Sequence, residues 1–355
     1  MKNYNITINN KIILLLFSLI FIVACNDTSV ITPEPIKFGK LQKDTINKRE
    51  NLILLGENMG IRPAGMKILI DSNYVLGLDS IKVWNNSKIE IIPPKFTGKH
   101  QLRILTEKDT SPVYTYYLNE VRNIDFKLVV ADSFLMGDNN GLVNERPAHM
   151  VKIPKDFYAS IYEVSQAVYI DVCDANPSIT KGDNLPVHNI DWIDAVIFCN
   201  KLSKIKGLSL YYKIINDIVS IDTNSNGFRL PTEAEWEFMC RAGSKGDFNV
   251  DKNPNEFAWY NLNSGFQLKE SGKLLPNAFG LYDMHGNLWE WCWDYYADDY
   301  YKSSPKLNPL GPNTGKNRVL RGACYSSGST DLRSSSRNQP EDKKSKTGIR
   351  IIRNK

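Results

Sequence analysis

The side chains best suited to redox or metal chemistry in this 355-residue chain are its six cysteines and four histidines. One cysteine, Cys25, lies near the start; the others are Cys173, Cys199, Cys240, Cys292 and Cys324. No two of them form a Cys-x-x-Cys pair, so the sequence predicts neither a zinc site nor a dense disulfide framework. Four of the later five lie in apolar patterns, where a free cysteine packs as a small hydrophobic residue. Only Cys324 lies in a polar stretch, RGACYSSGSTDLRSSSR (321–337).

The histidines and the overall charge exclude further classes of chemistry. His100, His149, His188 and His285 are scattered, and the chain has no Gly-x-Ser-x-Gly motif of a serine hydrolase. The chain is 42% hydrophobic and 23% charged, which is a globular composition. Its net charge of +5 is small for this length, so we expect no nucleic-acid partner.

The N-terminus is typical of an exported protein. An unbroken apolar run, residues 12–23, follows two lysines and is too short to span a bilayer, but it fits the core of a signal peptide. The run ends in a small residue followed by Cys25, which resembles a lipoprotein lipobox. The resemblance implies a signal peptide at 1–24 and a lipidated Cys25 with a tether at 25–35. We therefore expect a protein that is anchored in a bacterial membrane, the outer membrane, and is exposed on the cell surface.

Residues 36–120 have the pattern of a small all-β domain. Short runs of β-branched and aromatic residues alternate with turn residues every 8–12 positions. The stretches LLGENMG (54–60) and KVWNNSKIEIIPP (82–94), with Gly98 before a further strand, resemble the immunoglobulin-like IPT/TIG family. The resemblance implies a β-sandwich that acts as a spacer or an interaction module.

From residue 124 onward the pattern changes to a few helices separated by long irregular stretches. A first helix is predicted at 163–173, with Ser165 as its N-terminal cap. A second is predicted at 191–207, from Asp191 to the stop at Gly207. A third lies in 229–243, where Thr232 and Glu235 form a capping box and Gly243 ends the helix.

The order of motifs in this second part resembles the formylglycine-generating enzyme (sulfatase-modifying factor) family across residues 124–353. The motifs are FLMGD (134–138), ERPAHMV (145–151), EVSQAVY (163–169), PVHNIDWIDAVIFCN (186–200), GFRLPTEAEWEFMCRAG (227–243), PNAFGLYDMHGNLWEWCWDYY (276–296), RVLRGACY (318–325), and Arg337 with TGIR (347–350). The resemblance implies an α+β, loop-rich, C-type-lectin-like domain, here preceded by the IPT/TIG-like sandwich.

The stretch 283–294 combines packing with a calcium-binding pattern. Trp289, Trp291 and Trp293 alternate along an extended segment, so they are expected to share one face of a core strand. The family resemblance implies a structural calcium ion, a cation that prefers oxygen ligands. The implied ligands are Asp283, Gly286, Leu288 and Glu290. The alternative is that Asp283 and Glu290 bond backbone amides in a tight turn.

The catalytic residues of the family are missing at the matching positions. Family enzymes carry two cysteines in the final segment, which the resemblance implies hold Cu(I) and activate O₂. Here Ser327 stands at the first position, nothing near Leu332 supplies the second, and Cys324 falls three residues early. We therefore expect no bound copper and no formylglycine formation. Another enzymatic activity is left open, and the chain is better described as a binding protein than as an enzyme.

The polar string in 321–337 is instead interpreted as a ligand-binding rim. The fold resemblance implies that 321–345 form an exposed edge that contacts a glycan or a protein. Its candidate contact residues are Cys324, Tyr325, Ser326, Ser327, Gly328, Thr330, Asp331 and Ser336. The segment also resembles the variable region that diversity-generating retroelements alter by adenine-directed mutagenesis. Three alternatives stay open: a fixed binding surface, a structural lipoprotein of a secretion or gliding machinery, and an oxidoreductase-type enzyme.

Overall fold

The computed structural model describes residues 36–340 and 344–355, apart from short gaps at 44, 48–50, 60–61, 64, 72–73, 94–97, 107–109, 120, 217 and 249–252. The signal segment, Cys25 and the tether lie outside the described residues. Among the residues that are described, no helix has the length and apolar character needed to cross a bilayer. The chain divides into two compact units, and the main boundary lies between Tyr116 and Tyr117.

The N-terminal strands form two sheets. The first has the order β1 (Lys37–Leu41), β3 (Leu52–Glu57), β7 (Lys88–Ile91) and β6 (Ile81–Trp84). The second has the order β2 (Thr45–Asn47), β9 (Tyr114–Asn119), β8 (Gly98–Leu105), β4 (Lys67–Ile70) and β5 (Tyr74–Val75). Alternate residues such as Leu52 and Leu54 are fully buried. This period of two produced the strand prediction, and the assignment to the IPT/TIG family stays a prediction.

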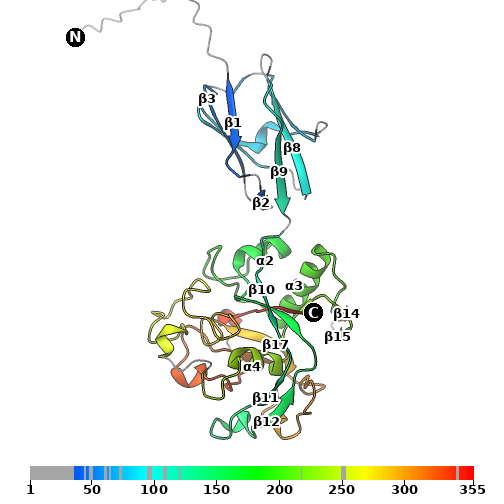
Figure 1. The fold of residues 1–355 in the computed structure, drawn as a ribbon, viewed down its shortest axis with the longest axis vertical. Coiled ribbons are helices and arrows are strands. Elements are labelled where there is room, and N and C mark those ends of the chain that lie inside the picture. The colour runs from blue at the N-terminus through cyan, green and yellow to red at the C-terminus, as the bar shows by residue number, and fades with distance from the viewer. Residues whose placement is uncertain are drawn as a thin grey trace, which may run out of the picture. The chain divides into compact units, whose positions relative to one another are not determined.

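The C-terminal unit consists of small sheets, short helices and long loops (Figure 1). One sheet has the order β10 (Phe126–Val129), β13 (Phe157–Ser160), β20 (Ile352–Asn354) and β16 (Phe228–Arg229). Another has the order β18 (Arg318–Arg321), β17 (Trp289–Tyr295) and β19 (Thr347–Gly348). Two hairpins complete the strands: β11 (Ser133–Met136) with β12 (His149–Lys152), and β14 (Tyr212–Ile215) with β15 (Ile218–Ile221). The described α-helices are α2 (Gln166–Cys173), α3 (Trp192–Ile205) and α4 (Glu233–Arg241).

Short 3₁₀ turns connect these elements, at Leu78–Ser80, Val143–Glu145, Pro254–Glu256, Tyr300–Lys302, Ser329–Leu332 and Lys344–Lys346. The large share of irregular chain and the few helices match the loop-rich α+β architecture that the motif order indicated.

The helix boundaries confirm the capping signals. The Ser165 hydroxyl accepts a hydrogen bond from the Val168 amide (3.3 Å) at the start of α2. Thr232 and Glu235 form the predicted capping box of α4, with hydrogen bonds of 3.1 and 2.9 Å. The third cap, Asp191, precedes α3 and pairs with Asp194 in a capping box of its own. These signals act within one turn of helix, which explains why the sequence alone predicted them.

Strand β17 lies between two hydrophobic clusters. Trp289 and Trp291 belong to one cluster and Trp293 packs against it, which confirms that the three tryptophans share a face. Cys292, which points the other way, belongs to the second cluster together with residues of α4. Both faces of the strand are therefore buried, and the acidic residues Glu290 and Asp294 are buried with it.

Candidate functional site

Helix α4 provides buried carboxylates that hold the C-terminal segment. All nine of its residues are buried, including Glu233, Glu235 and Glu237. A buried carboxylate is tolerated when a cation and hydrogen bonds compensate the loss of hydration. Glu235 is paired with Arg229, whose two terminal nitrogens lie 2.7 and 2.8 Å from its oxygens.

The other two glutamates of α4 bind the first and last arginines of the polar segment. Arg337 donates to both oxygens of Glu233, at 2.6 and 2.9 Å. Arg321 pairs with Glu237 and also donates to the carbonyl of Ser336. Burial by itself would raise the pKa of Glu233, but Arg337 and Arg321 outweigh it, so this pKa lies below its ordinary value. The carboxylate is therefore held ionised between two guanidinium groups.

A third arginine anchors the same segment to the first part of the domain. Arg333 donates to both oxygens of Glu145, at 2.6 and 2.7 Å, and Ser335 adds a hydrogen bond of 2.9 Å to the same carboxylate. Bidentate pairs of this kind fix orientation as well as distance. We call residues 323–332 the rim loop, and Arg321, Arg333 and Arg337 the framework arginines.

The structure narrows the set of expected contact residues. Cys324, Ser327 and Ser336 are buried, so they do not present their side chains on the surface. The Ser327 hydroxyl accepts a hydrogen bond from the Cys324 amide (3.1 Å) and lies 3.4 Å from its sulfur. Cys324 and Ser327 stabilise the turn through these contacts, and Ser336 accepts a hydrogen bond from Arg321 at its carbonyl. A sequence of small polar residues does not by itself distinguish such buried roles from an exposed one.

The remaining predicted residues lie at the surface. Thr330 is exposed, whereas Tyr325, Ser326, Gly328 and Asp331 are half-buried. Lys346, which follows the predicted segment, donates to the Ser326 hydroxyl (2.8 Å) and lies 5.9 Å from the centre of the Tyr325 ring. The part of this segment at 341–343 lies outside the described residues.

A second loop extends this surface, and the sequence interpretation did not include it. The amide of Asn261 donates to the Ser327 carbonyl (3.1 Å), and the Ser264 hydroxyl donates to the Tyr325 carbonyl (2.6 Å). The loop exposes two large apolar side chains, Leu262 at 77% and Phe266 at 67%. Phe266 adopts a φ of +56°, which is rare for a bulky residue. The turn signal NSGF (263–266), next to an apolar residue, was the available clue.

The cysteines are placed for packing. Cys199 and Cys324 belong to one hydrophobic cluster, and Cys240 and Cys292 to the other. Burial raises the pKa of the Cys240 thiol to about 12 and raises those of Cys199 and Cys292 as well. Because the thiolate is the reactive and metal-binding form, these three thiols are unreactive at neutral pH. The expectation that the domain holds no copper stays a prediction.

The two acidic residues of the expected calcium site, Glu290 and Asp283, differ in how many of their oxygens have partners. Glu290 is paired with Arg350 (2.8 Å) and accepts a hydrogen bond from the Trp236 indole (2.7 Å). Asp283 accepts one hydrogen bond at Oδ2, from the Gly272 amide (2.6 Å). Its other oxygen, Oδ1, is buried and has no hydrogen-bond partner among the described residues. Burial raises the pKa of Asp283 to about 6.

Of the expected calcium ligands, some fit a hard cation and others are already paired. An unpartnered carboxylate oxygen is the ligand that Ca²⁺ prefers, so Asp283 is suited to the role. Gly286 has a φ of +120°, and a Cβ atom there would lie 2.2 Å from the Trp259 carbonyl oxygen, so only glycine fits at this turn. The charge of Glu290 is already matched by Arg350. Across the described residues, no group of three or more His, Cys, Asp or Glu side chains is arranged to hold a metal ion.

Comparisons with known proteins identify the family of the C-terminal part of the chain. The model of the sulfatase-modifying factor enzyme 1-like domain matches residues 119–355. A curated relative, the chaperone protein LppX of Paenibacillus barcinonensis, is 36% identical over 177 residues, covering 40% of this chain and 63% of the relative. The formylglycine-generating enzyme of Streptomyces coelicolor is 32% identical over 166 residues, covering 42% of this chain and 45% of the enzyme. The chain thus spans less than two thirds of these relatives.

Two solved structures are similar in fold to a large part of this chain. Treponema denticola variable protein 1 has a TM-score of 0.60 and 29% identity, covering 69% of this chain and 96% of that protein. PvdO from Pseudomonas aeruginosa has a TM-score of 0.54 and 25% identity, covering 65% of this chain and 94% of that protein.

Proposed function

The chain belongs to the family of sulfatase-modifying factor enzyme 1-like domains, and we propose that its domain binds a ligand through the rim loop without catalysing formylglycine formation. The observation that carries the proposal is that residues 321–337 combine buried, paired arginines with side chains that reach the surface. Three framework arginines are held by buried glutamates, while side chains between them, such as Thr330, reach the surface. Such an arrangement keeps the backbone fixed while the surface residues are free to differ.

The chemistry of the surface suits a glycan or a protein. Hydroxyl groups of Ser326 and Thr330 and the amine of Lys346 supply donors and acceptors. The exposed Leu262 and Phe266 supply apolar area, and aromatic side chains are common anchors in recognition sites. The similarity to a protein named variable protein 1 supports a binding surface, and that to a protein named chaperone LppX supports a protein ligand.

The proposed setting of the domain is the outer surface of a bacterial cell. The lipobox-like sequence ending in Cys25 supports export and lipid anchoring, and residues 36–120 would then act as the spacer. The likeness of 321–337 to a retroelement target supports genetic diversification of the rim loop. A reverse transcriptase gene and a near-copy of the gene's 3′ end beside it would test that part, and their absence would contradict it.

A structural calcium ion is part of the proposal. The side chain of Asp283, the backbone carbonyls of Gly286 and Leu288, and Glu290 would hold it, and the unpartnered Oδ1 of Asp283 supports this assignment. The ion would stabilise the turn that precedes β17 and take no part in chemistry.

The test compares binding with catalysis in one protein. The full chain, made soluble by Cys25→Ser, is applied to glycan and protein arrays, together with a variant that combines Tyr325→Ala, Thr330→Ala and Asp331→Ala. We expect the variant to lose the ligands that the parent retains. A matched control combines Lys213→Ala, Ile218→Ala and Ser220→Ala in the β14–β15 hairpin and should bind as the parent does. Stoichiometric Cu(I) binding with oxygen consumption on a cysteine-containing peptide would overturn the proposal in favour of an oxidoreductase.

A further inference from the structure

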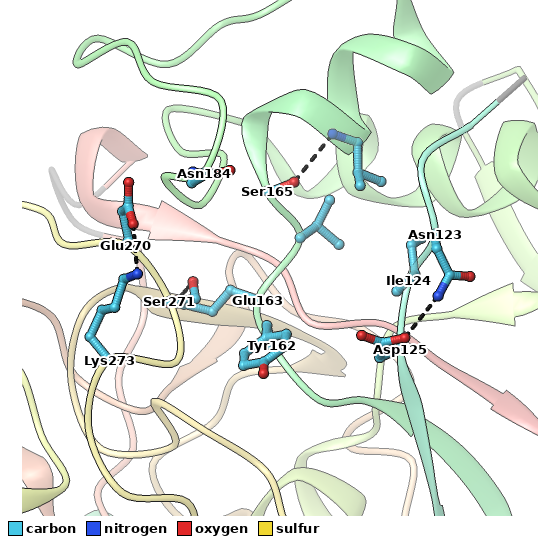
Figure 2. A pocket seen from close by; sticks show the side chains of 12 residues that line it. Asn123, Ile124, Asp125, Tyr162, Glu163, Ser165, Asn184, Glu270, Ser271 and Lys273 are labelled. Atoms are coloured by element: carbon cyan, nitrogen blue, oxygen red, sulfur yellow. Dashed lines mark hydrogen bonds and ion pairs between the residues drawn. The ribbon is translucent and has the colours of Figure 1, made fainter. Parts of the chain in front are cut away.

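A cavity of about 260 Å³ opens beside a buried glutamate that the sequence interpretation did not single out. Glu163 lies between β13 and α2 and is 3% exposed. The side chains of Tyr162, Glu163 and Ser271 line the cavity, and those of Glu163 and Ser271 lie next to each other (Figure 2). The cavity therefore extends to a residue that is otherwise enclosed.

One oxygen of Glu163 is bound and the other is not. Its Oε2 accepts hydrogen bonds from the Ser271 hydroxyl (2.8 Å) and the Asn287 amide (2.7 Å). Its Oε1 is buried and has no hydrogen-bond partner among the residues that the structure describes. A buried carboxylate oxygen left in this state is costly, so the site is incomplete without a further group.

Asp283 has the same pattern of one bound and one unbound oxygen, and its donor lies on the same loop as that of Glu163. Ser271 holds one oxygen of Glu163, and the next residue, Gly272, holds one oxygen of Asp283. Each carboxylate has one oxygen, Oε1 of Glu163 and Oδ1 of Asp283, that is without a hydrogen-bond partner in the described part of the chain.

The charges around these oxygens do not balance. Glu163, Asp283 and Glu290 are buried carboxylates, and Arg350, the buried cation among them, is paired with Glu290. Three ionised carboxylates and one guanidinium leave a formal charge of −2. A single divalent cation would neutralise this charge, and donors that are all oxygens select a hard cation such as Ca²⁺.

We infer that Glu163 is a ligand of the calcium ion, which its Oε1 shares with Oδ1 of Asp283. The inference rests on the proposed calcium site and adds one ligand to it: Glu163 supplies a further carboxylate beside that of Asp283. Calcium binding is thereby coupled to the loop at 270–273, because Ser271 and Gly272 orient both carboxylates. The cavity beside Glu163 provides the entry path.

The experiment uses the full chain with Cys25→Ser, stripped of metal by a chelator and titrated with CaCl₂ in a calorimeter. We expect one ion per chain and a melting temperature that rises with calcium, because a ligand of the native state stabilises it. Glu163→Gln should weaken calcium binding by roughly tenfold or more, since it removes one ligand charge. The matched control is Glu270→Gln, which lines the same cavity but is paired with Lys273 (3.0 Å); its affinity should be unchanged.

A second variant covers the case in which Glu163→Gln does not fold. Ser271→Ala removes one hydrogen bond to Oε2 and leaves the carboxylate in place, and we expect a smaller loss of calcium affinity. Unchanged affinity in both variants, with binding by the parent intact, would remove Glu163 from the site and leave the calcium proposal standing. A parent protein that binds no calcium would overturn both, without bearing on ligand binding by the rim loop.

Discussion

Replacing Arg337 tests whether the framework arginines hold the rim loop. Arg337→Met keeps an unbranched apolar chain but removes both hydrogen bonds to Glu233 and those to the carbonyls of Asn144 (2.7 Å) and Ala297 (3.2 Å). Glu233 then remains buried, with Arg321 at 3.5 Å as its nearest cation. Breaking a buried pair from one side costs about 3–5 kcal/mol, and the remaining arginine places our expectation near the lower end, at about 3 kcal/mol.

The assay is urea unfolding followed by tryptophan fluorescence. Six of the seven tryptophans belong to the C-terminal unit, so the signal reports mainly on that unit. A loss of about 3 kcal/mol corresponds to a melting temperature roughly 6–12 °C lower for a domain of this size. The matched control is Lys344→Met, because Lys344 forms a 2.6 Å pair with Asp191 in which both side chains are about half exposed. Its expected cost is below about 1 kcal/mol.

The acid limb of the stability curve gives an independent check. Glu233 has a lowered pKa in the folded protein, so its contribution is present above the ordinary carboxyl pKa and is lost as the pH falls through the lowered value. Adding Glu233→Gln to Arg337→Met should recover about 1 kcal/mol or more, since it removes the uncompensated charge. If the free energy of unfolding of Arg337→Met lies within about 1 kcal/mol of the parent's, as expected for the surface control, the framework arginines do not hold the rim loop as argued.

Three further outcomes are expected. His188 accepts hydrogen bonds at Nε2 from the amides of Ile179 and Thr180, and burial lowers its pKa. The free energy of unfolding should therefore decrease as the pH drops below about 6.5. His188→Gln should flatten this pH dependence in thermal melts. In urea unfolding, the exposed Thr330→Ala should change stability by less than about 0.5 kcal/mol, whereas Ser335→Ala should cost about 1–3 kcal/mol because it removes a hydrogen bond to buried Glu145. An oxygen electrode should record no uptake above background with Cu(I) and a cysteine-containing peptide, and sustained uptake would contradict the binding proposal.

The sequence determined the local elements of this protein. The caps at Ser165, Asp191 and Thr232 and the alternation of tryptophans along β17 depend on residues within a few positions of one another. Their interactions form within one turn or one strand, so the order of residue types specifies them. The motif order across 124–353 also identified the family, which the match to residues 119–355 confirmed.

Tertiary structure alone decided which polar residues are buried and what they contact. Arg333 and Glu145 are 188 residues apart, and Asn287 and Glu163 are 124 apart, so no local pattern could pair them. The same long-range packing buries Cys324, Ser327 and Ser336 and brings the loop that carries Phe266 beside the rim loop. Exposure and pairing depend on which distant segments cover a residue, and a periodic pattern of hydrophobicity records only the face on which that residue lies.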